Sequence, residues 1–171
     1  MKTIIRHIEY SEIELIQYIA RESWNIAYSK ILSKDQSKFM LNRFYEKEYV
    51  KVKMLDGEYF YVIKNHKEAI GFLSIQHLSS KYAKIHKLYV LPKYFGEGYG
   101  YQLFEFGIKW AETKKIEKLI LNVNRFNHAV SFYLKRGMRI TEIVDISIGD
   151  GYLMEDYIME INLSAFFSTN S

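Results

Sequence analysis

The sequence contains no cysteine among its 171 residues. Disulfides, cysteine-based zinc sites and thiol nucleophiles are therefore excluded. The chain also lacks any apolar run near the ~18 residues that a membrane-spanning helix needs. Its first residues, MKTIIRHIEYSEIE, lack the long uncharged apolar core of a signal peptide. We therefore expect a cytoplasmic protein with no membrane partner.

A dense block of lysine and arginine is missing too, although the formal net charge is +4. The positive charges are spread along the chain, which predicts no nucleic-acid partner. A mildly basic surface would suit an anionic cofactor. No cluster of histidines and carboxylates has ligand spacing, so we expect no metal.

Repeats, low-complexity tracts and Pro/Gly/Ser-rich linkers are absent as well. The length suits one domain, and a hydrophobic content of 49% is enough for a sizeable core. We predict a single domain over residues 1–171. A homodimer is a possible assembly, since dimers are the most common soluble oligomers.

The periodicity of apolar residues, together with capping and turn residues, predicts an alternation of strands and helices. Ser11 and Glu14 form a capping-box pattern before a first helix, Ser33 is placed to cap a second helix, and Gly137 is placed to close the last. The residues NHKE read as a hairpin turn. The expected strands are 2–8, 58–64, 69–76, 83–90, 118–123, 139–147 and 157–163, and the later helices are about 34–46, from the glycine stretch to about 113, and 127–136. The fold class is therefore α/β, antiparallel in its first half and β-α-β-α after it.

The stretch FGEGYGYQL, residues 95–103, places three glycines between an expected strand and an expected helix. Glycines let the backbone turn its N–H groups toward a ligand, and the helix adds its free N–H groups and positive dipole end. The alternative interpretation is a plain structural turn. A Walker loop is absent, and the glycine spacing is not that of a Rossmann fingerprint. The pattern that remains is [QR]-x-x-G-x-[GA], matched at Gly98 and Gly100.

Two longer segments carry a resemblance to a known family. LYVLPKYFGEGYGYQLF resembles motif A of the GNAT superfamily of acetyl-CoA-dependent N-acetyltransferases, and LILNVNRFNHAVSFYLKRGM resembles its next block. The resemblance implies a GNAT-like mixed sheet of about seven strands flanked by about four helices, with a splay between the third/fourth-position central strands. W-x-x-A-Y at 24–28, HKLYV and IGDGYLMEDYIME resemble bacterial relatives of polyamine acetyltransferases.

The resemblance also implies a binding site for acetyl-CoA as co-substrate. The pantetheine arm would pair with the main chain of Leu88, Tyr89 and Val90 as an added strand. Asn127 would hydrogen-bond the same arm, with Asn124 as its rival; either asparagine could instead cap a helix. The pyrophosphate would lie over the loop of Phe95, Gly96, Glu97, Gly98, Tyr99, Gly100 and Tyr101.

Phe95 departs from the family pattern, which has Gln or Arg at that position. The loop must therefore hold the phosphates mainly by its backbone.

Tyr133 matches the tyrosine that acts as general acid on the departing thiolate. The general base is less defined, because Lys84 stands where some family members carry Glu on the third strand. His86 shares a strand face with Lys84 and titrates near neutrality, so we consider it as the base. The alternative is a histidine that is simply hydrogen-bonded within the sheet.

Trp24 and Tyr28 lie four residues apart on one helical face, where they could contact an amine substrate or belong to the core. The C-terminal part adds the acids Glu142, Asp145, Asp150, Glu155 and Asp156, which could bind a cationic amine or simply be solvated.

The expected function is transfer of acetyl from acetyl-CoA to a primary amine of a small, polyamine-like molecule or a peptide by direct attack. The alternative is a non-catalytic acyl-CoA-binding or regulatory module with the same fold.

Overall fold

The computed structural model describes residues 3–164, which form seven strands, five α-helices and two short 3₁₀ helices. The strands are β1 (Ile4–His7), β2 (Glu58–Lys64), β3 (Ala69–His77), β4 (Tyr82–Val90), β5 (Lys118–Asn124), β6 (Arg139–Gly149) and β7 (Tyr152–Asn162). The helices are η1 (Tyr10–Glu12), α1 (Ile13–Ala27), α2 (Lys34–Tyr45), α3 (Lys47–Leu55), η2 (Pro92–Tyr94), α4 (Tyr99–Thr113) and α5 (Ala129–Lys135).

The sheet is mixed, with the strand order β1-β2-β3-β4-β5-β7-β6. Strands β1 to β3 pair antiparallel in sequence order, as do β5, β7 and β6 in spatial order. The parallel register of β4 with β5 joins Tyr82–Ile85 to Lys118–Leu121. The predicted mixed α/β class and the seven strands are confirmed; the helices number five, one more than expected.

The chain forms two compact units. The first unit comprises residues 1–76 and 86–107, and the second comprises residues 77–85 and 108–171. Strand β4 and helix α4 each contribute residues to both units.

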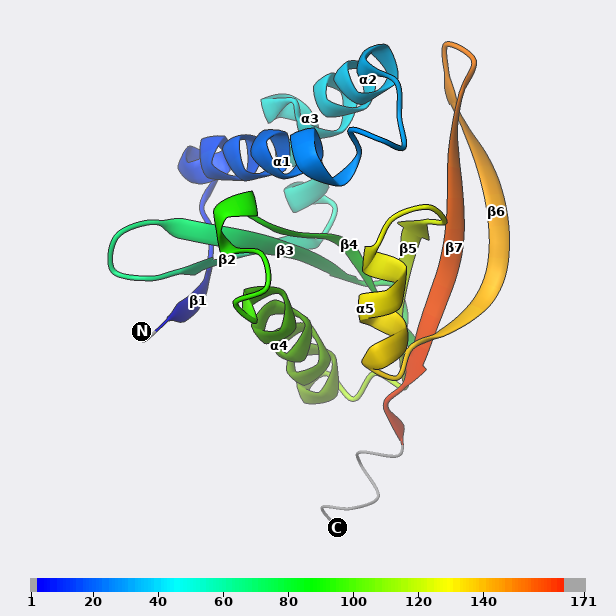
Figure 1. The fold of residues 1–171 in the computed structure, drawn as a ribbon. Helices are drawn as coiled ribbons and strands as arrows, with labels where there is room; N and C mark the ends of the chain where they lie inside the picture. Colours follow the sequence, from blue (N-terminus) through cyan, green and yellow to red (C-terminus); the bar gives the residue numbers. More distant parts are fainter. Residues whose placement is uncertain (1–2, 165–171) are drawn as a thin grey trace. The chain divides into compact units, whose positions relative to one another are not determined.

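The first unit is built in layers around β2, β3 and β4. One face carries Phe60 and Phe72, and Tyr45 of α2 packs edge-on against Phe72. Alternation turns Tyr61 to the other face, where it contacts Phe106 of α4. Helices α1, α2 and α3 therefore cover one face of these strands and the start of α4 covers the other (Figure 1).

The second unit contains a long hairpin of β6 and β7, with β5 paired to β7 (Figure 1). Helix α5 precedes this hairpin, and Gly137 follows α5 with a φ of +86°. That value places Gly137 in the left-handed region, so the predicted glycine at the end of this helix is confirmed.

Two helix starts show where local signals succeed and fail. Ser33 caps α2 as predicted, because its hydroxyl accepts a hydrogen bond from the N–H of Gln36 at 3.1 Å. The predicted cap at Ser11 is wrong. The capping box joins Glu9 and Glu12 instead, and it encloses η1, which directly precedes α1.

Helix α3 was not expected from the sequence. Its residues, KEYVKVKML, bury only Val50, so they lack a clear apolar stripe. The backbone of Glu46 is extended, with ψ at 142°, and it separates α3 from α2.

A buried ion pair lies between β4 and β2 in the first unit. The ammonium of Lys87 donates to a carboxylate oxygen of Glu58 at 2.9 Å, and the Glu58 side chain is only 2% exposed. The same ammonium lies over the rings of Tyr45 and Phe60. Burial alone would raise the pKa of Glu58, but the charges of Lys87 and His86 outweigh it, and the pKa is lowered from its ordinary value.

Replacing Lys87 with Met should leave Glu58 buried without its cation. We expect a loss of about 3 to 5 kcal/mol in the free energy of unfolding at neutral pH. In the wild type the pKa of Glu58 is lower in the folded protein than in the unfolded chain, so the charged carboxylate stabilises the fold above the unfolded pKa, and this stability is lost as pH falls. In Lys87→Met burial instead raises the pKa of Glu58. The free energy of unfolding of the variant therefore decreases further as pH rises. Urea unfolding at about pH 4 and about pH 7.5 measures the difference.

Lys51→Met is the matched control, because Lys51 and Glu48 form an exposed pair at 4.0 Å. A pH-independent deficit in Lys87→Met, or one equal to that of Lys51→Met, would contradict the role of the buried pair.

Candidate active site

The end of β4 offers main-chain groups at only one of its edges. The N–H of Leu91 donates to the carbonyl of Ile70 on β3 at 2.8 Å. A Cβ added at Gly71 would meet the carbonyl oxygen of Tyr89 at 2.5 Å, so this oxygen also turns toward β3. Because backbone groups alternate between strand edges, those of Leu88 and Val90 turn to the opposite edge. Leu88 and Val90 are therefore better placed than Tyr89 for pairing with an added extended chain.

The carbonyl of Val90 already has one partner. The hydroxyl of Ser23 on α1 lies 2.9 Å from it and 2.6 Å from the carbonyl of Ile19. A carbonyl oxygen has two lone pairs, so Val90 can still accept a second hydrogen bond.

The glycine loop leads directly into α4. Gly96 and Gly98 have φ values of +81° and +84°, which side chains with a Cβ rarely adopt. The N–H groups of Phe95 and Glu97 donate back to the carbonyls of Pro92 and Tyr94. The alternate N–H groups, those of Gly96 and Gly98, donate to no acceptor within residues 3–164.

The first bond of α4 runs from Gln102 to Gly98, so the N–H groups of Tyr99 and Gly100 precede the helical ladder. A Cβ built at Gly96 or Gly98 would meet nothing within 4 Å. Open space and unused N–H groups beside the positive end of a helix fit a pyrophosphate. Phe95 is 49% exposed and contributes no polar group.

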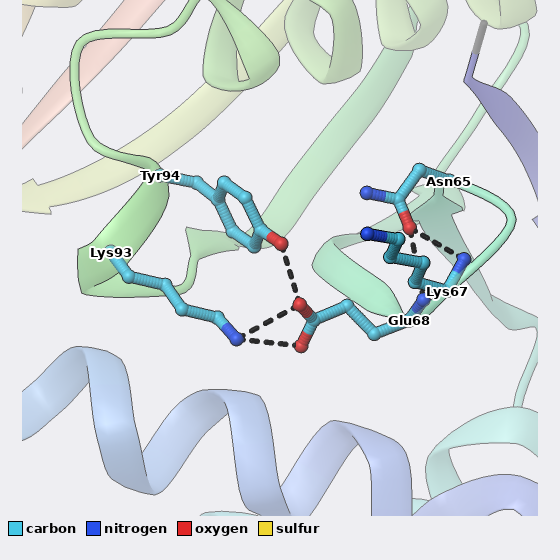
Figure 2. Close-up of polar contacts among 5 residues, drawn as sticks. All are labelled: Asn65, Lys67, Glu68, Lys93 and Tyr94. Atoms are coloured by element: carbon cyan, nitrogen blue, oxygen red, sulfur yellow. Dashed lines mark hydrogen bonds and ion pairs between the residues drawn. The ribbon is translucent and has the colours of Figure 1, made fainter. Parts of the chain in front are cut away.

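A side-chain network ties this loop to the β2–β3 hairpin (Figure 2). The Glu68 carboxylate accepts from the Lys93 ammonium at 2.8 and 2.9 Å and from the Tyr94 hydroxyl at 2.5 Å. The hydrogen bond from Lys93, with that from Tyr94, lowers the pKa of Glu68. Asn65 holds the hairpin turn, since its side-chain oxygen accepts the N–H groups of Lys67 and Glu68. The predicted hairpin turn at NHKE is thus confirmed.

His86 is held by Gln76 of β3. Its Nε2 lies 2.9 Å from the side-chain oxygen of Gln76, whose amide nitrogen donates to the carbonyl of Asp56. This bond is consistent with a structural histidine, and it also fixes the orientation of the ring. Its role as a base stays a prediction.

Trp24 and Tyr28 lie in a buried aromatic cluster, with ring centroids 4.5 Å apart and exposures of 5% and 9%. The hydroxyls of Tyr28 and Tyr89 are 3.5 Å apart, and Tyr45 meets Trp24 edge-on. Burial raises the pKa of both Tyr45 and Tyr89 well above its ordinary value. Trp24 also lines a groove between α1 and α2.

In the second unit, Tyr133 lies on α5 with 7% exposure and packs edge-on against Phe132. Both candidate asparagines make local hydrogen bonds through their side-chain oxygens. Asn124 accepts from the N–H of Phe126 at 3.0 Å, and Asn127 accepts from the N–H of Ala129, the first residue of α5, at 2.9 Å. Each amide retains its NH₂ donors for another partner.

Internal partners occupy part of the acidic C-terminal segment. Arg125 pairs with Asp145 at 2.7 Å and with Glu155 at 3.2 Å. Asp156 is buried and lies 3.5 Å from the Asn122 amide nitrogen. Burial raises the pKa of Asp156, against the opposing influence of Asn122.

Glu142 and Asp150 have no ion-pair partner in the part of the chain that the structure describes. Only these two of the five predicted acids therefore remain without either an ion pair or burial.

Sequence reasoning missed Lys87, Glu58, Gln76 and Glu68, because their partners are distant in the chain. Lys87 and Glu58 are 29 residues apart, and Lys93 and Glu68 are 25 apart. No group of three His, Asp or Glu side chains in residues 3–164 is arranged to hold a metal ion. None of the helices described there is long and apolar enough to cross a membrane.

Comparisons with known proteins agree with this geometry. Residues 17–138 match the model of the acetyltransferase (GNAT) family. Spermidine N(1)-acetyltransferase of Thermoplasma acidophilum is 27% identical over 166 residues, covering 94% of this chain and 97% of that protein.

Solved structures are similar as well. The PaiA N-acetyltransferase of Thermoplasma acidophilum, in complex with coenzyme A, has 26% identity and a TM-score of 0.82, covering 95% of this chain and 99% of that one. A GCN5-related N-acetyltransferase of Rhodopseudomonas palustris shares the fold, with 19% identity, a TM-score of 0.81 and coverage of 95% and 96%. The chain therefore belongs to the GNAT family and is an N-acetyltransferase that uses acetyl-CoA as its co-substrate.

Proposed function

We propose that this single-domain enzyme transfers acetyl directly from acetyl-CoA to a primary amine of a small, polyamine-like molecule or of a peptide. The observation that supports a primary amine as acceptor is the similarity to a spermidine acetyltransferase over nearly the full length of both chains. The amine nitrogen attacks the thioester carbonyl carbon, a C–N bond forms, and the C–S bond breaks. The sulfur leaves as a thiolate and takes a proton, so the products are an N-acetyl amine and CoA.

The chain's own groups have distinct parts in this proposal. Leu88 and Val90 pair with the pantetheine arm, together with Asn127 or its rival Asn124. The N–H groups of the glycine loop hold the pyrophosphate. Tyr133 protonates the leaving sulfur, because a phenol pKa of about 10 is close enough to a thiol pKa of about 8.5 for donation as the bond breaks. His86 accepts the proton of the attacking amine, directly or through water.

Release of free thiol from acetyl-CoA with a panel of primary amines tests the proposal. Tyr133→Phe should lower kcat by about 10²- to 10⁴-fold, because it removes the acidic proton and little else. Acetyl-CoA affinity and the melting temperature should stay close to those of the wild type.

Tyr18→Phe is the control, since Tyr18 is an exposed tyrosine on α1. Binding of CoA without turnover on any amine would support the non-catalytic module instead. Full activity in Tyr133→Phe would exclude Tyr133 as the general acid.

His86→Gln should flatten the rise of kcat/KM with pH. A base works in its neutral form, so the wild-type rate rises as pH passes the imidazole pKa. Within the first unit, Glu58 is a charged group that interacts with His86. An unchanged pH profile beside the control His66→Gln, which changes a histidine in the β2–β3 turn, would exclude His86 as the base.

Glu68→Gln should weaken CoA binding by up to about tenfold and leave kcat at saturation unchanged. In the wild type the charge of Glu68 holds both Lys93 and Tyr94 at the start of the loop. The substitution removes this charge. Since the pKa of Glu68 is lowered, the wild-type contact is present above the ordinary carboxyl pKa and is lost as pH falls. Calorimetric titration with CoA measures the effect, with Glu48→Gln on α3 as the control. Equal affinity in both variants would show that the network does not position the loop.

A further inference from the structure

A groove of 930 Å³ lies between α1 and α2 in the first unit. Trp24 and Tyr45 provide aromatic surface in it, together with Leu32 and Leu41. The groove is large enough for a small-molecule ligand. Its polar lining is rich in hydrogen-bond donors, which include the side-chain amides of Asn25 and Asn42.

The charge of this groove is positive. Arg21, Lys34 and Lys38 line it, against a single acid, Glu46. Within residues 3–164 none of these three cations has an ion-pair partner. The other acids of these helices are not among the groove's lining residues. Unpaired cations around a recess favour an anionic ligand over a cationic one.

Trp24 contributes aromatic surface to the groove, and its side chain is 5% exposed. Its indole N–H makes no hydrogen bond of ordinary geometry among the described residues. The acceptor that it faces is the hydroxyl of Tyr45, because this contact opposes the rise that burial causes in the pKa of Tyr45.

None of the groove's lining residues belongs to β4, and Trp24 is the residue that connects the groove to the strand with the proposed pantetheine contacts. Trp24 contacts Tyr28 and lies 6.3 Å, centroid to centroid, from the ring of Tyr89 on β4. A ligand resting on Trp24 would therefore lie on the helical side of β4.

We propose that the groove binds an oxyanion carried by the amine acceptor, a carboxylate or a phosphate. This inference rests on the proposed acetyl transfer and selects between its acceptor classes. An amino-acid-like or peptide acceptor with an anionic group is preferred over a purely cationic polyamine. Arg21 supplies planar donors for the oxyanion, and Lys34 and Lys38 supply point charges.

Pairs of acceptors that differ only in the anionic group measure the contribution of that group apart from the contribution of the amine. Lysine and cadaverine differ only by a carboxylate, and O-phosphoethanolamine and ethanolamine differ only by a phosphate. We expect kcat/KM to be about 10- to 100-fold higher for the anionic member of at least one pair, and the pair that shows it identifies the oxyanion. Arg21→Gln and, as a second variant, Lys38→Gln should reduce this preference through KM while kcat is retained. Arg43→Gln is the control, because Arg43 lies on α2 outside the groove lining.

Equal rates within both pairs, or a preference for the cationic members that survives Arg21→Gln, would overturn the groove assignment and leave the proposed amine acetylation standing. Titration of lysine or O-phosphoethanolamine into the protein–CoA complex gives a readout without turnover. Binding that weakens in Arg21→Gln and not in Arg43→Gln would support the groove even where no amine is acetylated. No binding of either anion would overturn it.

Discussion

The buried pair of Lys87 and Glu58 is the constraint on which the first unit depends. Burying two charges is unfavourable unless each has its partner, so β4 must keep the position in which Lys87 reaches Glu58 on β2. That position also places the ammonium over Tyr45 and Phe60, and it fixes the face on which Tyr89 meets the aromatic cluster. The edge of β4 that offers Leu88 and Val90 to an extended ligand follows from the same position.

In its proposed role as the pyrophosphate site, the glycine loop would bind an anion by geometry, with little charge of its own. Its nearest lysine, Lys93, is neutralised by Glu68, and Phe95 replaces the usual polar side chain of the family. The recognition that remains comes from backbone N–H groups and from the start of α4, whose directions are set by the positive φ values at Gly96 and Gly98. Such a site depends on the exact path of the backbone, because it has no flexible cation that could compensate for a displaced loop. In this proposal the network of Glu68, Lys93 and Tyr94 at the entrance of the loop would position the loop for its ligand, besides being a surface contact (Figure 2).

The sequence predicted those features whose causes are local. Ser33, the NHKE turn and Gly137 act within a few residues, and each was found at its expected place. The cap at Ser11 failed because Glu9 and Glu12, two residues earlier, form a competing box. The sequence did not predict helix α3, because this helix is stabilised by packing of Val50 rather than by an apolar stripe. The ion pair of Lys87, the amide that orients His86 and the groove between α1 and α2 depend on residues brought together by the fold. No spacing along the chain could reveal them.

The charges around the proposed acceptor bear on the difficulty of the reaction itself. An amine must lose a proton before it attacks, and this chain has Lys84 where some relatives place a glutamate base. In the proposed arrangement the oxyanion of the acceptor lies beside Arg21, Lys34 and Lys38, which have no ion-pair partner within residues 3–164. The bound oxyanion would offset these positive charges, so the groove would orient the acceptor without lowering the pKa of its amine. Deprotonation of the amine would then depend on the proposed base, His86, acting directly or through water.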